Sequence, residues 1–158
     1  METIDFLEKN LARQLGWIQA ADKRLSLVLP LSTAMLGGLA AVSPAACNWS
    51  ILAAVFTSFA VVLLCLSVLF CAVSSFPRTV GPKGSLIYFG GIGARDVAQF
   101  QSEVVSLTDE KYIEDLARQC HANASIACSK YDWVKRGMAS LFLATIPWAF
   151  AIYFLYSV

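Results

Sequence analysis

Two long stretches without an ionisable side chain divide this chain. Residues 25–77 and 137–158 contain no Asp, Glu, Lys, Arg or His. A membrane-spanning helix needs about 20 apolar residues, so the first stretch is long enough for two crossings and the second for one. The Ser-Pro segment at residues 43–48 predicts the turn of a hairpin between the first two crossings. We therefore expect membrane spans at residues 25–42, 49–74 and 137–158.

Ahead of the first span, apolar residues recur with helical spacing. They are Ile4, Leu7, Leu11, Leu15, Ile18 and Ala21. Steps of three and four place them on one stripe of an amphipathic helix, and Gln14 is expected to lie mostly off that stripe. No helix breaker separates residues 1–24 from the first span, so the two are predicted to form one continuous helix.

A similar pattern precedes the last span. Thr108 can cap a helix, and acids follow it in the first turn, where the helix dipole favours them. The apolar stripe is Ile113, Leu116, Cys120, Ala124, Ala127, Tyr131 and Val134. Because no Pro or Gly interrupts it before Gly137, we expect one helix of about 48 residues that runs into the third span.

These patterns predict an all-α membrane protein with three transmembrane helices. The first and third are extended by amphipathic helices outside the membrane. Pro77 ends the second span, since the residue before a proline, Phe76, is driven out of helical geometry. A shorter amphipathic helix is expected at residues 95–107. The segments are then 1–24, a hairpin at 25–75, a charged segment at 76–136 and a span at 137–158.

Charge is segregated along the chain in a way that predicts topology. All 12 Lys and Arg and all 11 Asp and Glu lie in residues 1–24 and 78–136. Basic residues near membrane ends stay in the cytoplasm, so the N-terminus and the charged segment are predicted inside and the C-terminus outside. A soluble helical domain would mix charge into its surface helices. A cleaved signal peptide at the first apolar stretch is also disfavoured, because the charged segment before that stretch is 24 residues long and contains acids.

The residues that carry chemistry exclude several function classes. No ionisable group lies within a predicted span, which argues against proton relays and intramembrane metalloproteases. His121 with Cys120 and Cys128 fits no zinc-ligand spacing. We therefore expect no enzyme activity, no cofactor and no metal. The net charge of +1 argues against a nucleic-acid partner.

A glycine-rich segment at residues 78–94 is the least regular part of the chain. Glycine-rich backbone next to basic residues can cradle a phosphate. The segment matches neither a P-loop nor a dinucleotide fingerprint. The alternative is a re-entrant loop in which residues 86–89 dip into lipid headgroups. Both interpretations remain open on the residues alone.

Several short motifs recur in order around the three apolar blocks. They are Trp17-Ile18, Ala21-Asp22-Lys23, Phe76-Pro77-Arg78, the run from Ser85 to Gly90, Asn123, Ile126-Ala127 and Lys130-Tyr131. Together they resemble the Pycsar transmembrane effector family. The resemblance implies bacterial antiphage defence, in which a partner cyclase makes cyclic UMP or cyclic CMP on infection. An effector in the inner membrane senses the nucleotide and impairs that membrane, which causes abortive infection.

A cyclic nucleotide needs a cation or amides for its phosphate, an aromatic face and a polar group for the base. The candidate ligand-binding residues are Arg78, Lys83, Gly84, Ser85 and Arg95 for the phosphate, Tyr88 and Tyr131 for stacking, and Asn123 for the base. For Trp17, Asp22, Lys23 and Lys130 we expect a structural role in locking helices together, with an ion pair between Asp22 and Lys130. Asn123 has the same structural alternative.

Three helices cannot enclose a wide pore, so membrane damage requires several copies of the chain. Small residues let helices approach closely in lipid, and Ala34, Gly37, Gly38 and Ala41 predict such a contact face in the first span. A homo-oligomer is therefore expected. A structural membrane subunit that binds a protein partner is the alternative function.

Overall fold

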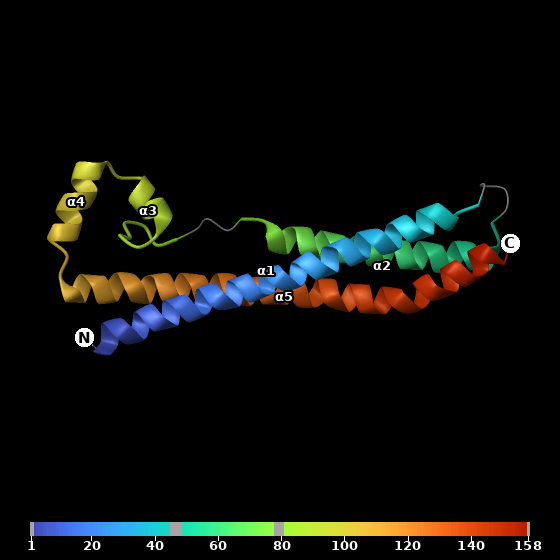
Figure 1. Cartoon of the computed structure of the whole chain (residues 1–158), viewed down its shortest axis with the longest axis horizontal. Coiled ribbons are helices and arrows are strands. Elements are labelled where there is room, and N and C mark those ends of the chain that lie inside the picture. Colours follow the sequence, from blue (N-terminus) through green and yellow to red (C-terminus); the bar gives the residue numbers. More distant parts are fainter. Residues whose placement is uncertain (1, 45–48, 78–80, 158) are drawn as a thin grey trace. The chain divides into compact units, whose positions relative to one another are not determined.

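The computed structural model describes residues 2–44, 49–77 and 81–157, and these residues form helices without strands (Figure 1). The elements are α1 (Glu2–Val42), α2 (Ile51–Ser75), α3 (Phe89–Gly93), α4 (Val97–Val105) and α5 (Asp109–Tyr156). Within the described ranges, α1, α2 and α5 are long and apolar enough to cross a membrane. The all-α membrane fold is thus confirmed, including a third spanning helix of 48 residues.

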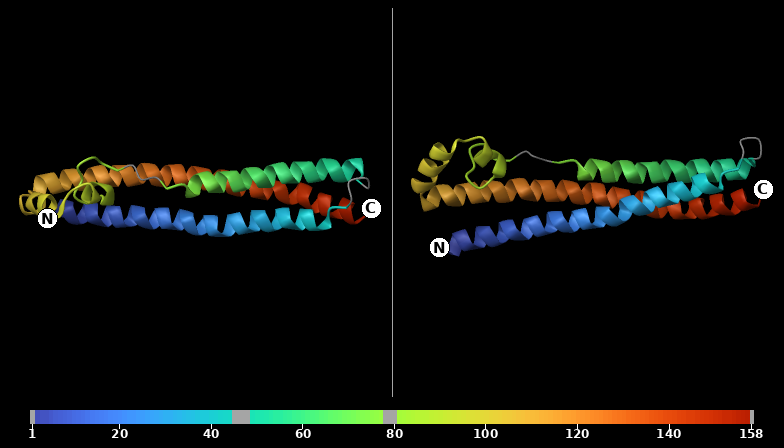
Figure 2. Two further views of the ribbon diagram at one scale, coloured as in Figure 1. Left: turned by 90° about the horizontal axis from the view of Figure 1, so that it is seen from above. Right: turned by 45° about the horizontal axis from the view of Figure 1, so that its top comes forward.

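The chain divides into two compact units. The loop unit combines Met1–Ala20 with Pro77–Ser129, and the span unit combines Ala21–Phe76 with Lys130–Val158. Both α1 and α5 are continuous helices that contribute residues to each unit (Figure 2). The apolar stretches belong to the span unit, and most charged residues belong to the loop unit.

Buried residues in the span unit recur in alternating steps of three and four. On α2 they are Ala53, Thr57, Ala60, Leu64, Ser67, Cys71 and Ser74. On α1 they are Ala21, Leu25, Val28, Ser32, Met35 and Leu39. This average period of about 3.5 residues is typical of helices that pack with a left-handed supercoil. Apolar residues off these stripes, such as Leu27 and Phe59, are exposed, as lipid-facing side chains are in a membrane.

Polar contacts tie the three spanning helices together inside the span unit. The hydroxyl oxygens of Ser32 on α1 and Ser67 on α2 lie 2.9 Å apart. Ser67 also donates to the carbonyl of Gly137 on α5 at 2.9 Å. Trp148 donates its indole N–H to the carbonyl of Met35 at 3.0 Å. The Ser32 hydroxyl also donates to the carbonyl of Val28 in its own helix at 2.8 Å. Because hydrocarbon offers no competing water, these groups depend on partners within the protein.

Three of the four small residues predicted as a contact face in the first span point away from the bundle, whereas the fourth, Gly38, is half-buried against Trp148. Ala34, Gly37 and Ala41 are exposed, and a side chain built on Gly37 meets nothing within 4 Å. They therefore do not serve the packing of one chain on itself. Their contact with a second copy stays a prediction.

At Gly137, α5 packs closely on α2, so a larger side chain is expected to have a large effect. A Cβ at this position lies 3.2 Å from Cys71 Sγ and 3.6 Å from the Ser67 carbonyl oxygen. Gly137→Leu is expected to destabilise the span unit by about 1–3 kcal/mol through overpacking. Thermal unfolding in detergent at monomeric dilution measures this. Gly37→Leu is the matched control, and an equal loss of stability in both variants would contradict the prediction.

The α1 segment of the loop unit differs from its predicted stripe at one position. Gln14 is buried, with 6% of its surface exposed, whereas Leu15 is 46% exposed. The expectation that Leu15 lies on the stripe and Gln14 off it is therefore wrong. The reason is phase: the three-four alternation of Ala21 and Leu25 extends backward through Ile18 to position 14. On α5, by contrast, the predicted stripe residues are buried or half-buried.

The end of α2 follows the proline rule. The helix ends at Ser75, and Phe76 adopts an extended conformation with ψ of 128°. This is the geometry expected of a residue that precedes a proline. Phe76 belongs to the span unit and Pro77 to the loop unit.

Candidate ligand site in the loop unit

A tight turn centred on Ser85 organises the glycine-rich segment. The Ser85 hydroxyl oxygen accepts hydrogen bonds from the backbone N–H groups of Ile87 and Tyr88, at 3.1 and 2.9 Å. Gly84 has φ of +76°, a left-handed conformation that other residues rarely adopt. The segment then enters α3, a short helix that the sequence pattern did not predict.

The Arg95 guanidinium binds the inside of this turn. Its N–H groups donate to the carbonyl oxygens of Ser85 at 3.0 Å, Gly91 at 2.5 Å and Gly84 at 2.6 Å. Its Nε donates to a carboxylate oxygen of Glu103 on α4 at 2.8 Å. Only 10% of the Arg95 side chain is exposed. Arg95 therefore joins the turn, α3 and α4.

Close packing explains why the segment is rich in glycine. A Cβ on Gly91 lies only 2.3 Å from the carbonyl oxygen of Ser85, so no larger residue fits there without movement of the backbone. A Cβ on Gly81 or Gly90 lies 2.6 or 2.5 Å from the Tyr88 ring. The ring of Tyr88 thus packs against the backbone of two glycines.

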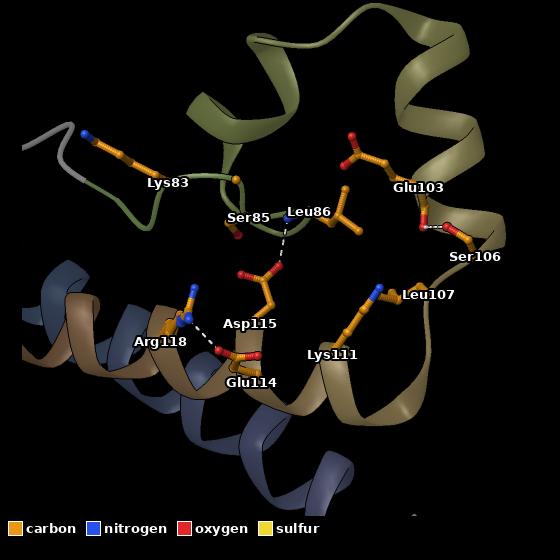
Figure 3. A pocket seen from close by; sticks show the side chains of 11 residues that line it. Lys83, Ser85, Leu86, Glu103, Ser106, Leu107, Lys111, Glu114, Asp115 and Arg118 are labelled. Atoms are coloured by element: carbon orange, nitrogen blue, oxygen red, sulfur yellow. Dashed lines mark hydrogen bonds and ion pairs between the residues drawn. The ribbon is translucent and has the colours of Figure 1, made fainter.

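Asp115 attaches the turn to α5. One of its carboxylate oxygens accepts a hydrogen bond from the backbone N–H of Leu86 at 2.7 Å (Figure 3). The amides of residues 86–88 therefore all have acceptors within the protein. A phosphate at this turn would be met mainly by side-chain cations rather than by these amides.

A polar cavity of about 300 Å³ lies between the turn, α4 and α5. It is lined by Lys83, Gly84, Ser85, Leu86, Glu103, Ser106, Leu107, Lys111, Glu114, Asp115 and Arg118. The volume is at the lower end of the range of about 300–1,000 Å³ for small-molecule sites. In Figure 3, Lys111 and Arg118 rise from α5 toward the turn, and Lys83 extends away from the other lining side chains.

Each acid that lines the cavity has a hydrogen-bond or ion-pair partner, but Lys83 and Lys111 form no ion pair among the described residues. Glu114 pairs with Arg118, Glu103 with Arg95, and Asp115 with the Leu86 amide. Among the described residues, neither Lys83 nor Lys111 forms an ion pair. With Glu103 and Glu114 paired to arginines, Lys83 and Lys111 are balanced only by the carboxylate of Asp115, so the lining keeps an excess of one positive charge. Of the two lysines, Lys111 is the one whose side chain points toward the turn (Figure 3).

A second, larger cavity of about 650 Å³ shares Lys83 and Gly84 with the first. Tyr88, Arg95 and Gln99 also line it. Because Arg95 is bound to three carbonyls and a carboxylate, Lys83 is the uncommitted cation here among the described lining residues. The first cavity therefore offers one more unpaired cation, Lys111, than the second.

The predicted ligand-binding residues do not gather at one place. Lys83, Gly84 and Ser85 line the first cavity, and Lys83, Gly84, Tyr88 and Arg95 line the second. Asn123 is on the buried stripe of α5, and Tyr131 belongs to the span unit. Arg78 lies outside the described residues. Ligand contact by these residues stays a prediction.

Asn123 belongs to a buried polar set rather than to either cavity. It is 7% exposed, and its amide oxygen accepts from Gln119 at 3.5 Å. Gln14 donates to Asn10 at 3.2 Å. The amide oxygens of Gln14 and Gln119 have no hydrogen-bond partner within the described structure. This geometry favours a structural role for Asn123 over a reader of the base.

The residues predicted to lock helices divide between the two units. In the span unit, Lys130 forms an ion pair with Asp22, as expected, and its carbonyl accepts from Ser74 at 3.4 Å. Trp17 lies in the loop unit and is about half exposed. Lys23 is exposed and has no ion pair in the part of the chain that is described. Their proposed locking role stays a prediction.

Sequence reasoning missed the cavity residues of α4 and α5. They are Glu103, Ser106, Lys111, Glu114, Asp115 and Arg118. A usable signal exists, because Lys111, Asp115 and Arg118 are spaced four and three apart and so form one polar stripe.

Tyr112 provides a pH-dependent contact between α1 and α5 in the loop unit. Its hydroxyl donates to Glu8 at 2.7 Å. This bond, then burial and the charges of Glu8 and Asp115, raise the pKa of Tyr112 above its ordinary value. The raised pKa means that the contact stabilises the fold below about pH 10 and is lost as pH rises through the folded pKa.

We expect Glu8→Gln to lower the pKa of Tyr112 toward its ordinary value. Ultraviolet titration of the tyrosines, with Tyr112→Phe subtracted to isolate this ring, measures the shift. Glu2→Gln removes an equal charge from the same helix and should leave the titration unchanged. A titration of Tyr112 that Glu8→Gln does not move would contradict the contact.

Comparison with known proteins gives the family. A family model described as the Pycsar effector protein domain matches residues 6–157. The Pycsar effector protein PtPycTM of Propioniciclava tarda is 24% identical over 131 residues, which cover 77% of this chain. The chain spans 65% of the length of that relative. No solved structure matches the chain. Since the family model matches nearly the whole sequence, the chain belongs to the Pycsar effector protein domain family.

Proposed function

We propose that this protein is a membrane effector of antiphage defence that binds cyclic UMP or cyclic CMP and then impairs the inner membrane. Family membership and three helices able to span a membrane support an antiphage membrane effector. The segregation of charge supports a cytoplasmic loop unit. The candidate nucleotide site is the polar cavity of the loop unit.

The unpaired lysines of that cavity carry the proposal, Lys111 first, because its side chain points toward the turn whereas that of Lys83 points away (Figure 3). A cyclic nucleotide holds one negative charge on its phosphodiester, and Lys83 and Lys111 are lining cations without an acid partner among the described residues. Charge-assisted hydrogen bonds to such a phosphate are stronger than neutral ones. The existing pairs of Arg118 and Arg95 need not break for the ligand to bind.

Other lining groups suit the sugar and base. One carboxylate oxygen of Asp115 binds the Leu86 amide, and its second oxygen is available to accept from a ribose hydroxyl. The Ser106 hydroxyl already donates to the carbonyl of Glu103 and retains acceptor capacity for a base N–H. The cavity is polar enough to hold a small nucleotide and too small for a large ligand.

The helix that forms one wall of the cavity also supplies a membrane span. Residues of α5 line the cavity, and the same helix continues without interruption to Tyr156. Ligand binding can shift the equilibrium between two conformations of such a helix only if the ligand binds one conformation more tightly than the other. The size of the shift is set by that difference in affinity. A hundredfold difference in affinity corresponds to about 2.7 kcal/mol. We place the resulting lesion in an oligomer that forms through the exposed face of Ala34, Gly37 and Ala41.

Lys111→Gln is expected to weaken cyclic pyrimidine nucleotide binding about tenfold, because one phosphate cation is lost. Calorimetry on the detergent-purified chain measures this, with cyclic AMP as the specificity control. Arg13→Gln is the matched charge control, since Arg13 is an exposed cation outside the cavity. Absence of binding by the folded wild type would overturn the proposal, and equal losses in both variants would overturn this site.

Membrane damage needs a separate experiment. Liposomes that contain the protein and a trapped dye should leak when cyclic UMP or cyclic CMP is added on the side of the loop unit. Leakage that continues at densities where the protein is monomeric would contradict the oligomeric lesion. Leakage without any nucleotide would contradict the sensor.

A further inference from the structure

The span unit contains a cavity, lined by charged and by apolar side chains, that the nucleotide hypothesis does not use. It has a volume of about 430 Å³ and lies between α1 and α5. Its lining is Arg24, Tyr131, Asp132, Val134, Lys135, Met138, Ala139 and Phe142. All of these residues belong to the span unit.

The cavity lies where charge ends on two adjacent helices. Arg24 is the last charged residue before the first apolar stretch, and Lys135 is next to the last one before the final stretch. Phe142 is seven residues beyond Lys135, which is about 10 Å along a helix. The lining therefore changes from cationic to apolar over the depth at which a lipid changes from headgroup to acyl chain.

The charged groups of this cavity suit a single negative charge. Arg24 stacks over the Tyr131 ring, with 5.3 Å between the guanidinium carbon and the ring centroid. Arg24, Lys135 and the one lining acid, Asp132, form no ion pairs with each other or with other described residues. Two cations and one acid leave a net charge of +1. Stacking on Tyr131 also holds Arg24 in place before any ligand binds.

The apolar part of the lining distinguishes a lipid from a soluble anion. Met138, Ala139 and Phe142 follow the charged residues, and Phe142 is exposed on the membrane-facing part of α5. A free phosphate or nucleotide has no group to cover such a surface, whereas an acyl chain does. Basic pockets between membrane helices on the cytoplasmic side are known to bind anionic lipid headgroups.

From this arrangement we infer that the cavity between α1 and α5 binds an anionic phospholipid. The phosphodiester of a lipid such as phosphatidylglycerol lies between Arg24 and Lys135, and one acyl chain follows Met138 and Phe142. In the proposed topology this lipid belongs to the inner leaflet. The site is distinct from the candidate nucleotide site, since it shares no residue with the loop-unit cavities.

The test is retention of lipid by the full chain in native mass spectrometry. The protein is exposed to equal amounts of phosphatidylglycerol and phosphatidylcholine, and phosphatidylglycerol should dominate the bound fraction. Replacing both Arg24 and Lys135 by Gln should reduce its affinity about tenfold or more, from the loss of two phosphate cations. Replacing Lys23 and Arg136 by Gln removes the same charge beside the cavity and should change retention less than about twofold.

Three results would overturn the inference. Equal losses in the two double variants would indicate general surface attraction rather than a site. Equal retention of phosphatidylcholine would remove the need for the cations. Displacement of the lipid by soluble glycerol phosphate or cyclic UMP would identify a site for soluble anions. Phe142→Ala, which leaves the charge unchanged, should also weaken retention at least about twofold. Circular dichroism checks that each variant keeps its helices.

Discussion

Gly91→Val should open the turn around Ser85 and abolish the proposed nucleotide binding. The new Cβ would lie 2.3 Å from the Ser85 carbonyl oxygen, which is backbone and has no rotamer to escape into. The same carbonyl accepts a hydrogen bond from Arg95, so displacement of the turn also disturbs this contact. We expect a local loss of stability of about 3 kcal/mol or more, at the upper end of overpacking costs.

Hydrogen exchange of the amides at residues 86–88 measures this effect directly. An opening cost reduced by about 3 kcal/mol accelerates exchange roughly a hundredfold, provided that these amides exchange through local opening. Gly93→Val is the matched control in the same short helix, because a Cβ there meets nothing within 4 Å. Protected amides in Gly91→Val would show that the backbone relaxes without losing the turn.

Arg95→Ala is the second substitution with a large expected effect. It removes three hydrogen bonds to carbonyl oxygens and leaves Glu103 without its guanidinium partner. Loss of a largely buried charged partner costs about 3 kcal/mol. We therefore expect faster exchange at the turn even when no nucleotide is present, together with loss of nucleotide binding.

The sequence hypothesis for Arg95, direct contact with the phosphate, predicts a different pattern. It requires lost binding with normal exchange in the absence of nucleotide. Arg95→Lys separates the roles further, since lysine keeps the charge but cannot reach three carbonyls and a carboxylate with one planar group. If Arg95→Lys binds nucleotide normally, the positive charge matters more than the bracing of the turn.

Long-range architecture was predictable because the bilayer imposes simple rules on sequence. The uncharged stretches, the stop at Phe76 and the absence of a breaker between Thr108 and Gly137 together predicted three spans and a 48-residue helix. Each rule depends on neighbours within a few residues, and such local rules are visible in the sequence itself.

The site was less predictable because its contacts join residues that are distant in sequence. Asp115 binds an amide 29 positions earlier, a contact that local spacing does not predict. Arg95 was assigned to a phosphate, but carbonyls within the protein occupy its donors. Gln14 was placed off the stripe because polarity was weighed above helical phase. Spacing predicts which face a residue shares, but not which partner that face meets.

The unbroken three-four spacing of α1 limits how the length of this helix can change during evolution. Its inward positions keep one phase from Leu7 through Gln14 and Ala21 to Leu39. One inserted residue near Ala21 would rotate everything beyond it by about 100° and turn lipid-facing side chains inward. Seven inserted residues restore the phase almost completely. Homologues should therefore differ in the length of this helix by whole heptads. In a series of variants with one to seven inserted residues, only the seven-residue insertion should retain antiphage defence.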